Sequence, residues 1–442
     1  MHGSLDQALH AHASGSASSL LVSRRGFLYG AAGIAACAMG AAAIGMAGCS
    51  GGAEEGASLE IVDSKVVGFE DVEPISVSAE SVFTADDCEI IEDLDGTVRM
   101  AKQVSLPYGT MLWASDDAVA ACLIPGETSD PLAQVGLLSL DDGKCTVVLD
   151  SAVGASEGFQ IYDARADSSG IVWTEADILT GTWRVYSAKT SGASSISGDP
   201  VLLEENADGW MAPSLVASGE HAFWQTAPKS PASSEGAVGR IMRAPFGASA
   251  DDAVVVLEAH GLSSCPMSPT ASGIAASLAA DDTGSSYGIV AIDGSDGTIS
   301  DQMLLPSPMR PTYAAFGPTG FGFAFENIYE DDGGIANLGT YATVASDPQG
   351  QWFHFARTPF ESPAWSNGWL LVKSTGVVAG IDMASKRYFT IEPENITQGY
   401  GEFLASESDA ARFVTYSTID YTPLNKDHIY ECNVRIWEPA SI

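Results

Sequence analysis

The sequence predicts an all-β protein built from a repeated unit of about fifty residues. Short apolar segments with period-two alternation recur along the chain, and turns rich in Gly and Asp separate them. The 442 residues include 46 Gly and 21 Pro, which is typical of a chain with many turns. No convincing amphipathic helix follows residue 50, so strands are expected to supply the whole core.

The third strand of each unit gives the clearest series. It alternates apolar and polar residues, and turns such as Asp141-Asp142-Gly143 follow several of its copies, a pattern typical of hairpins. The predicted third strands are 135–140, 183–188, 239–244, 287–292, 339–344, 377–382 and 432–437.

A shorter fourth strand is expected to close each unit except the last. These strands are 145–149, 200–203, 254–257, 302–305, 351–355 and 388–391. The last unit has no fourth strand before Ile442, whereas a strand around Thr97–Val104 precedes the first unit and has no partner. Seven four-stranded units closed by this N-terminal strand therefore account for every predicted strand.

This arrangement resembles the β-propeller, and the resemblance covers residues 91–442. A single four-stranded sheet cannot cover both of its faces, so stacking around a ring buries them. Rings of six or eight blades and a two-domain β-sandwich are the alternatives. Residues 59–90 are strand-like and either pack on the ring or continue a tether. We expect the ring to be monomeric.

Residues 1–48 are expected to be an export signal. Ser23-Arg24-Arg25-Gly26-Phe27-Leu28 precedes a weakly apolar Ala/Gly stretch and resembles the twin-arginine signal, in which Arg24 and Arg25 are the paired arginines. The alternative is a transmembrane helix over residues 30–48, which is about long enough to span a bilayer.

The signal ends in Ala47-Gly48-Cys49, which resembles a bacterial lipobox. The resemblance implies that Cys49 is acylated and anchors the protein to the lipid bilayer, because two acyl chains hold a protein stably. Met46 departs from the usual Leu, and the alternative is a cysteine placed by chance. Residues 49–58 then form the lipidated cysteine and a flexible tether.

The other cysteines do not define a clear set of disulfides. Cys37 leaves with the signal, and Cys88, Cys122, Cys145, Cys265 and Cys432 remain, an odd number. A disulfide between Cys88 and Cys432 would staple the two ends of a closed ring. The alternative is that both are buried thiols that behave as small apolar side chains.

The charge excludes one class of partner. The chain carries 20 Lys+Arg against 57 Asp+Glu, a formal net charge of −37. Such a surface repels DNA, RNA and anionic lipid headgroups, so no nucleic-acid partner is expected.

The connections between blades are the predicted ligand-binding face. Aromatic residues recur there, and aromatic side chains at the mouth of a ring can stack on a ligand. Arg310 can fix an anionic group, and Glu175 and Glu326 close second strands near the same face and could collect a cation. The predicted ligand-binding residues are Tyr108, Phe159, Trp210, Arg310, Tyr400, Glu175 and Glu326, with Cys265 or Met267, Met309 and Phe360 at equivalent positions. The alternatives are packing between blades, structural ion pairs and solvated loop charges.

No motif identifies a catalytic or metal site. Gly154-Ala155-Ser156-Glu157-Gly158 matches G-x-S-x-G, but a strand rather than a helix is predicted after it. No H-E-x-x-H, P-loop or dinucleotide motif is present, and no cofactor is implied. The Asp pairs at 281–282 and 331–332 lack EF-hand spacing, although Ca²⁺ could bind at some of the turns.

The whole chain resembles a twin-arginine-exported lipoprotein of a high-GC Gram-positive bacterium. We expect a membrane-anchored, extracytoplasmic binding or scaffold module for a protein, peptide or carbohydrate. The alternative is a secreted propeller enzyme, either a carbohydrate hydrolase or lyase or a redox protein loaded with a cofactor before export.

Overall fold

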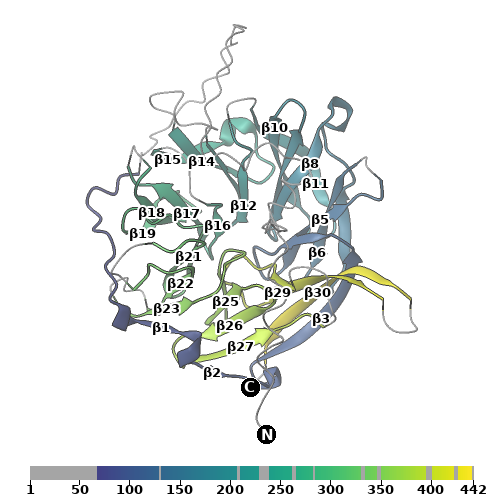
Figure 1. Ribbon diagram of the computed structural model, residues 1–442. Helices are drawn as coiled ribbons and strands as arrows, with labels where there is room; N and C mark the ends of the chain where they lie inside the picture. The colour runs from purple at the N-terminus through teal and green to yellow at the C-terminus, as the bar shows by residue number, and fades with distance from the viewer. Residues whose placement is uncertain are drawn as a thin grey trace, which may run out of the picture. The chain divides into compact units, whose positions relative to one another are not determined.

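The computed structural model describes residues 67–128, 131–206, 210–227, 238–260, 265–281, 284–329, 334–345, 350–394, 401–422 and 427–440. These residues form seven four-stranded blades arranged as a β-propeller (Figure 1). The predicted fold class and blade number are therefore confirmed.

The first three blades follow the repeat closely. The first contains β4 (Met111–Trp113), β5 (Val119–Pro125), β6 (Ala133–Ser139) and β7 (Cys145–Leu149). The second contains β8 (Gln160–Ala166), β9 (Gly170–Asp177), β10 (Thr182–Thr190) and β11 (Ile196–Asn206). The third contains β12 (Ser214–Ser218), β13 (His221–Thr226), β14 (Val238–Pro245) and β15 (Val254–His260).

The next three blades repeat the pattern. The fourth contains β16 (Ser268–Pro269), β17 (Gly273–Ala279), β18 (Tyr287–Asp293) and β19 (Ile299–Leu304). The fifth contains β20 (Tyr313–Gly317), β21 (Gly320–Phe325), β22 (Gly339–Thr343) and β23 (Trp352–Phe355). The sixth contains β24 (Ala364–Ser366), β25 (Trp369–Lys373), β26 (Val378–Asp382) and β27 (Arg387–Ile391).

The seventh blade joins the two ends of the chain. It contains β28 (Glu402–Leu404), β29 (Phe413–Tyr421), β30 (Ile429–Pro439) and, as its outer strand, β3 (Val98–Pro107). β3 pairs antiparallel with β30, from Val98 opposite Pro439 to Pro107 opposite Glu431. The N-terminal strand thus closes the ring as predicted.

Neighbouring blades share apolar clusters, which form the core. In one cluster Leu112 and Cys122 of the first blade pack with Cys432 and Val434 of the seventh, so the seam where the ring closes is as apolar as the others. Alternating strand residues supply each cluster because successive side chains point to opposite faces of a sheet.

Residues 67–90 pack on the ring and are called here the outer strap. In Figure 1 the purple segment that carries β1 (Val82–Thr84) and β2 (Glu89–Ile90) runs along the outside of the blades. β1 pairs parallel with β23, and β2 pairs parallel with β27. Its short 3₁₀ helices are η1 (Ala79–Ser81) and η2 (Ala85–Asp87); η3 (Leu94–Gly96) follows the strap, and η4 (Ala155–Glu157) and η6 (Ala250–Asp252) lie in the ring.

The possible disulfide between Cys88 and Cys432 is not formed. Both thiols are free. Cys88 packs against the cluster shared by the fifth and sixth blades, whereas Cys432 is buried between the seventh and the first. The alternative of two free thiols holds because the strap carries Cys88 past other blades before β3 reaches the closing seam.

The antiparallel order gives the ring two different faces. The turns between first and second strands and between third and fourth strands lie on one face, called here the hairpin face. The connections between blades and between second and third strands lie on the other, called the crossover face. The ligand-binding face predicted from the sequence is the crossover face.

Candidate functional site

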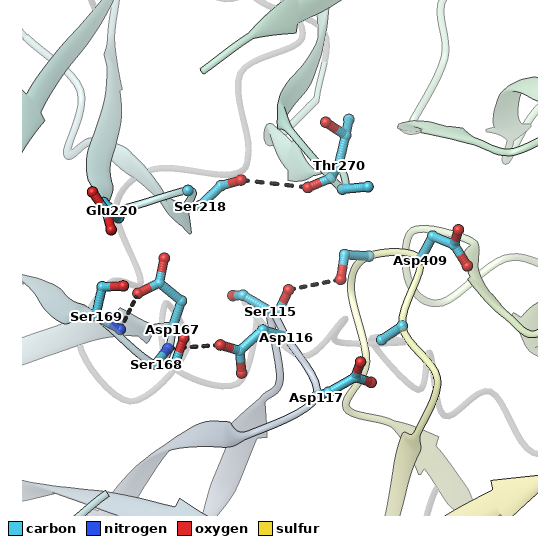
Figure 2. Close-up of a pocket in the computed structure, with 14 residues that line it drawn as sticks. Ser115, Asp116, Asp117, Asp167, Ser168, Ser169, Ser218, Glu220, Thr270 and Asp409 are labelled. Carbon is cyan, nitrogen blue, oxygen red and sulfur yellow. Dashed lines mark hydrogen bonds between the residues drawn. The ribbon is translucent and has the colours of Figure 1, made fainter. Parts of the chain in front are cut away.

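A pocket of about 290 Å³ opens on the hairpin face, where the innermost strands of five blades turn (Figure 2). The innermost strands of a propeller surround its central channel, so these turns meet around the axis. The lining residues are Ser115–Asp117, Asp167–Ser169, Ser218–Glu220, Thr270–Ala271 and Ser408–Ala410.

The pocket lining is acidic. Five of its fourteen residues carry a carboxyl group and none is Lys or Arg. The acidic residues are Asp116, Asp117, Asp167, Glu220 and Asp409, and they come from the first, second, third and seventh blades. Carboxylates gathered around one opening concentrate a negative potential there, which attracts cations.

Asp116 ties two turns of the pocket together. Its Oδ1 accepts hydrogen bonds from the backbone N–H groups of Ala118 and Val119, both at 2.9 Å. Its Oδ2 accepts one from the Ser168 N–H at 2.6 Å, across the seam between the first two blades. The carboxylate of Asp116 therefore positions the wall of the pocket.

Asp167 is buried beside Asp116. Its Oδ1 accepts hydrogen bonds from the N–H groups of Ser169 at 2.8 Å and Gly170 at 3.1 Å. Burial, reinforced by the negative charge of Asp116, nevertheless raises the pKa of Asp167 to about 6. The Asp167 carboxyl group can therefore change its charge in a mildly acidic medium.

Asp117 and Asp409 form a second acidic pair. The Asp117 Oδ1 accepts a hydrogen bond from the Arg412 backbone N–H at 2.8 Å, and the Asp117 carbonyl oxygen accepts one from the Arg412 Nη1 at 3.5 Å. The guanidinium forms its ion pairs with Asp141 and Glu438. Burial, together with the charge of Asp117, raises the pKa of Asp409. The two carboxyl groups thus repel one another within the pocket.

Ser115 adds a buried hydroxyl group to the lining. Its side chain is 7 % exposed, and among the described residues its Oγ has no hydrogen-bond partner. Its carbonyl oxygen accepts a hydrogen bond from the Ser408 Oγ at 2.7 Å. A buried hydroxyl without a partner carries an energetic cost, which the surrounding turns must offset.

A network of charged side chains lies next to the pocket lining, further along the same innermost strands. Arg165 is 2 % exposed, and its guanidinium stacks over the Trp113 ring with Cζ 4.1 Å from the ring centroid. Its Nη1 bonds to the Asp163 carboxylate, and its Nε lies 3.1 Å from a Glu407 carboxylate oxygen. Two carboxylates therefore already engage the Arg165 charge, which leaves the pocket negative.

The predicted residue Glu175 has a structural role. It is 0 % exposed, and its carboxylate accepts hydrogen bonds from the N–H groups of Val153 at 2.6 Å and Gly154 at 2.9 Å and from the Trp173 indole at 3.0 Å. Glu326, at the corresponding strand end of the fifth blade, is exposed. The structure does not bring the two carboxylates together.

The predicted aromatic residues contact different local partners. Phe159 is buried under the Arg184 guanidinium, 4.0 Å from its ring centroid. Tyr108 stacks on Tyr430 with ring centroids 3.6 Å apart, and Trp210 packs into the cluster between the second and third blades. The linkers that carry these residues start at the outer strands, so the same position in the repeat does not place them at the axis.

The remaining predicted ligand-binding positions differ in their exposure. Arg310 is exposed and lies 5.5 Å from the Tyr287 ring, while Cys265, Met267, Met309 and Phe360 are buried. The residues that lie outside the described part of the chain are Arg24, Arg25, Cys49 and Tyr400.

Sequence analysis missed the residues that line the pocket. Their signal is a Ser, Thr, Asp or Glu cluster directly after the first strand in five blades, as in Ser115-Asp116-Asp117 and Ser408-Asp409. Such clusters are typical of ordinary turns. Only the ring brings them together.

One hydrogen-bonded row has the order of a hydrolytic triad. The Thr422 Oγ1 lies 2.6 Å from the His428 Nδ1, and the His428 Nε2 lies 3.0 Å from an Asp420 carboxylate oxygen. The row sits at the β29–β30 connection, and the His428 side chain is 50 % exposed. Open solvent surrounds the row, whereas nucleophile activation depends on a site that excludes water. We assign this row a role in holding the hairpin.

In the described part of the chain no group of three or more His, Cys, Asp or Glu side chains is placed to hold a metal ion. Nor do those residues include a helix of the length and apolar character needed to cross a membrane.

Comparisons with known proteins concern the fold. No protein-family model matches the sequence. No curated protein matches it either. Similar solved structures include a prolyl endopeptidase (12 % identity, TM-score 0.47), oligopeptidase B from Leishmania major (12 %, 0.43) and an acylaminoacyl peptidase from Pyrococcus horikoshii (11 %, 0.42). The matches cover 74 %, 72 % and 73 % of this chain and 50 %, 46 % and 52 % of those chains, so the chain spans about half the length of these peptidases. At this level of identity the likeness concerns the fold alone.

Proposed function

We propose that this protein is a membrane-anchored, extracytoplasmic binding module whose acidic pocket takes a cationic ligand. The observation that carries the proposal is the lining of that pocket, in which five carboxyl groups occur without a Lys or Arg. The raised pKa values of Asp167 and Asp409 support it: burial and then a neighbouring carboxylate oppose the ionised form of each, and a bound cation would favour that form.

Hydrogen bonds between the blades make the surroundings of the pocket rigid, which favours ligand binding. Backbone hydrogen bonds join the inner strands of neighbouring blades, such as the Ala114 N–H to the Ala405 carbonyl at 2.9 Å and the Glu407 N–H to the Ala114 carbonyl at 3.0 Å. A rigid frame holds the carboxylates in place before the ligand arrives, which lowers the entropy cost of binding.

Calorimetric titration of the purified protein with n-butylammonium at low salt tests the pocket. We expect saturable binding that weakens as salt is added. The Asp409→Asn variant should bind more weakly, whereas Glu89→Gln, which removes an exposed carboxyl group on the outer strap, should bind as the native protein does. Absence of binding, or equal binding by Asp409→Asn, would refute the proposal.

The proposed export depends on Arg24 and Arg25, and the proposed membrane anchor depends on Cys49. Cys49→Ala should release the protein from the membrane or block processing of the signal, and lysines at positions 24 and 25 should stop export while folded protein accumulates in the cytoplasm. Lipid labelling and cell fractionation measure both effects. Normal labelling of Cys49→Ala would contradict the anchor, and normal export of the lysine variant would contradict the route.

A further inference from the structure

The outer strands of the ring differ in whether the strap covers them. The strap pairs with three consecutive blades: β1 lies parallel to β23, β2 lies parallel to β27, and the Ile75 N–H donates to the Leu304 carbonyl of β19 at 2.9 Å (Figure 1). In the described part of the chain no strand of the strap pairs with β3, β7, β11 or β15. The outer strands of this propeller can therefore accept a further extended segment, and four of them do not have one from the strap.

The four strands without the strap expose apolar side chains. Met100 of β3, Val147 of β7, Leu202 of β11 and Val254 of β15 are 40 %, 40 %, 38 % and 37 % exposed. On β19, β23 and β27, in contrast, every large apolar side chain is buried or half-buried. Side chains on neighbouring strands lie about 4.5–5.5 Å apart, so an added strand removes part of such a side chain from water. The uncovered strands thus carry the apolar surface that a further strand would bury.

The sequence of β7 sets it apart from the other three. Its residues Cys145–Leu149 include no charged side chain and no Pro. Charged side chains and Pro keep a sheet edge from pairing, and they occur in β3 as Arg99 and in β11 as Pro200. At β15 the Val67 N–H already binds the Glu258 carbonyl at 3.0 Å. β7 is therefore the outer strand whose sequence opposes pairing least.

The length of β7 also suits strand addition. β7 and β27 each have five residues, and the strap pairs with β27 through two residues and with the four-residue β23 through three. An extended segment of about five residues would span the whole of β7. Backbone hydrogen bonds would hold such a segment, and its alternate side chains would lie beside Val147.

The charge around β7 indicates which kind of segment fits. Asp142 and Asp150 flank the strand and are exposed, whereas Asp141 is paired with Arg412. Lys144 is the only basic residue in the sequence from 139 to 152. The chain as a whole has a formal net charge of −37, so two copies repel one another, and a segment with basic residues is attracted.

We propose that β7 is a docking edge for an extended, basic segment of another polypeptide, which adds a fifth strand to the first blade as the strap does to the fifth and sixth. The segment has β-branched residues opposite β7 and basic residues at its ends. This inference is independent of the cation pocket, because β7 is an outer strand and the pocket lies where the innermost strands turn.

Three acetylated and amidated peptides test the edge. They are Lys-Thr-Val-Ile-Val-Thr-Lys, an acidic twin with Glu at both ends, and a proline twin, Lys-Thr-Pro-Ile-Pro-Thr-Lys, which lacks two of the N–H groups that pairing needs. Fluorescence anisotropy at low salt measures their affinities. Val147→Lys places a charge on β7, and Leu202→Lys is the matched control, with the same charge at a similarly exposed site of β11. Thermal melting checks that both variants fold.

We expect the basic peptide to bind saturably, and both twins to bind at least about tenfold more weakly. Val147→Lys should lower the affinity for the basic peptide at least about tenfold, and Leu202→Lys should lower it about twofold at most. Amide hydrogen exchange should slow in β7 when the peptide binds and stay unchanged in β11.

Equal binding of the proline twin would show that the lysines rather than the peptide backbone make the contact, and this would refute strand addition. Equal losses in the two lysine variants would move the site away from β7, and failure of every peptide to bind would also refute the proposal. If the protein forms a dimer in size-exclusion chromatography that Val147→Lys dissociates, a second copy occupies the edge and the assignment of a basic partner is wrong.

Discussion

Asp167 is a residue whose charge opposes folding. Its pKa rises from 3.8 to about 6 in the folded protein, so its ionisation destabilises the fold by about 3 kcal/mol at most. This destabilisation is complete above about pH 6 and disappears as the pH falls below 3.8, because the carboxyl group is then protonated in both states.

We therefore expect Asp167→Asn to be more stable than the native protein at pH 7.5 and about equally stable near pH 4. Asn keeps an oxygen that accepts the Ser169 and Gly170 hydrogen bonds. Urea unfolding of both proteins at the two pH values measures the difference. A stability gain that does not shrink on acidification would contradict the assigned pKa.

Glu175 illustrates the opposite case, a charge that the fold requires. Its buried carboxylate accepts three hydrogen bonds, and Gln can replace only some of them. We expect Glu175→Gln to lose about 1–3 kcal/mol of stability. Glu326→Gln, at an exposed strand end, should change the stability by less than about 0.5 kcal/mol. Equal effects in urea unfolding would indicate that Glu175 is not structural.

These residues show what sequence could predict of the site. Glu175 was correctly placed at the end of a strand, but its burial depends on the Val153–Gly154 loop from the preceding linker, which no local pattern reveals. Asp116 and Asp409 occupy ordinary turn sequences nearly 300 residues apart. Their presence in one pocket follows from ring closure, and the pKa of Asp409 is raised by burial and by Asp117, which the ring brings beside it.

At the scale of elements, the third strands were predicted well because the alternation of apolar and polar residues dominates their sequences. Ile241 and Val290, for example, lie in alternating strands whose apolar side chains fill the clusters between blades. The outer strap was harder to predict. Its strands β1 and β2 have three and two residues, too few for a period to be visible.

β3 should be indispensable because it is the outer strand of the seventh blade. Its buried residues Val98 and Leu106 fill the seams on both sides of that blade. Removing it would leave β30 as a long unpaired edge, which favours aggregation.

A chain that starts at residue 108 should therefore aggregate or melt far below one that starts at residue 91, which keeps β3. Differential scanning calorimetry and size-exclusion chromatography compare the two. Equal melting temperatures would show that β3 does not close the ring.

At the scale of the whole molecule, the strap crosses three seams between consecutive blades, and the residue that follows it reaches a fourth. Phe69 belongs to the cluster of the third and fourth blades, Ile75 to that of the fourth and fifth, and Phe83 to that of the fifth and sixth. Ile91, just beyond the strap, packs against the cluster of the sixth and seventh. The N-terminal segment thus covers the outer ends of seams that would otherwise face water.

Phe69 offers the sharpest test of this role, because its ring packs directly on β18. A Cβ atom at Gly288 would lie 2.1 Å from the Phe69 Cε1, so the ring occupies the space that any larger residue at position 288 would need. Phe69 is 4 % exposed, and Phe69→Ala should lose about 3–5 kcal/mol. That loss is a large share of the 5–15 kcal/mol by which folded proteins are usually stable.

We expect Gly288→Ala to displace the same ring, so that both variants melt earlier and expose the strap to protease before the blades unfold. Gly376→Ala is the matched control, because nothing lies within 4 Å of a Cβ atom at that position. Limited proteolysis followed by mass spectrometry locates the first cleavage. Cleavage within residues 67–90 is the expected result for Phe69→Ala and Gly288→Ala. First cleavage within the blades in both variants would mean that the strap contributes nothing to the stability of the ring.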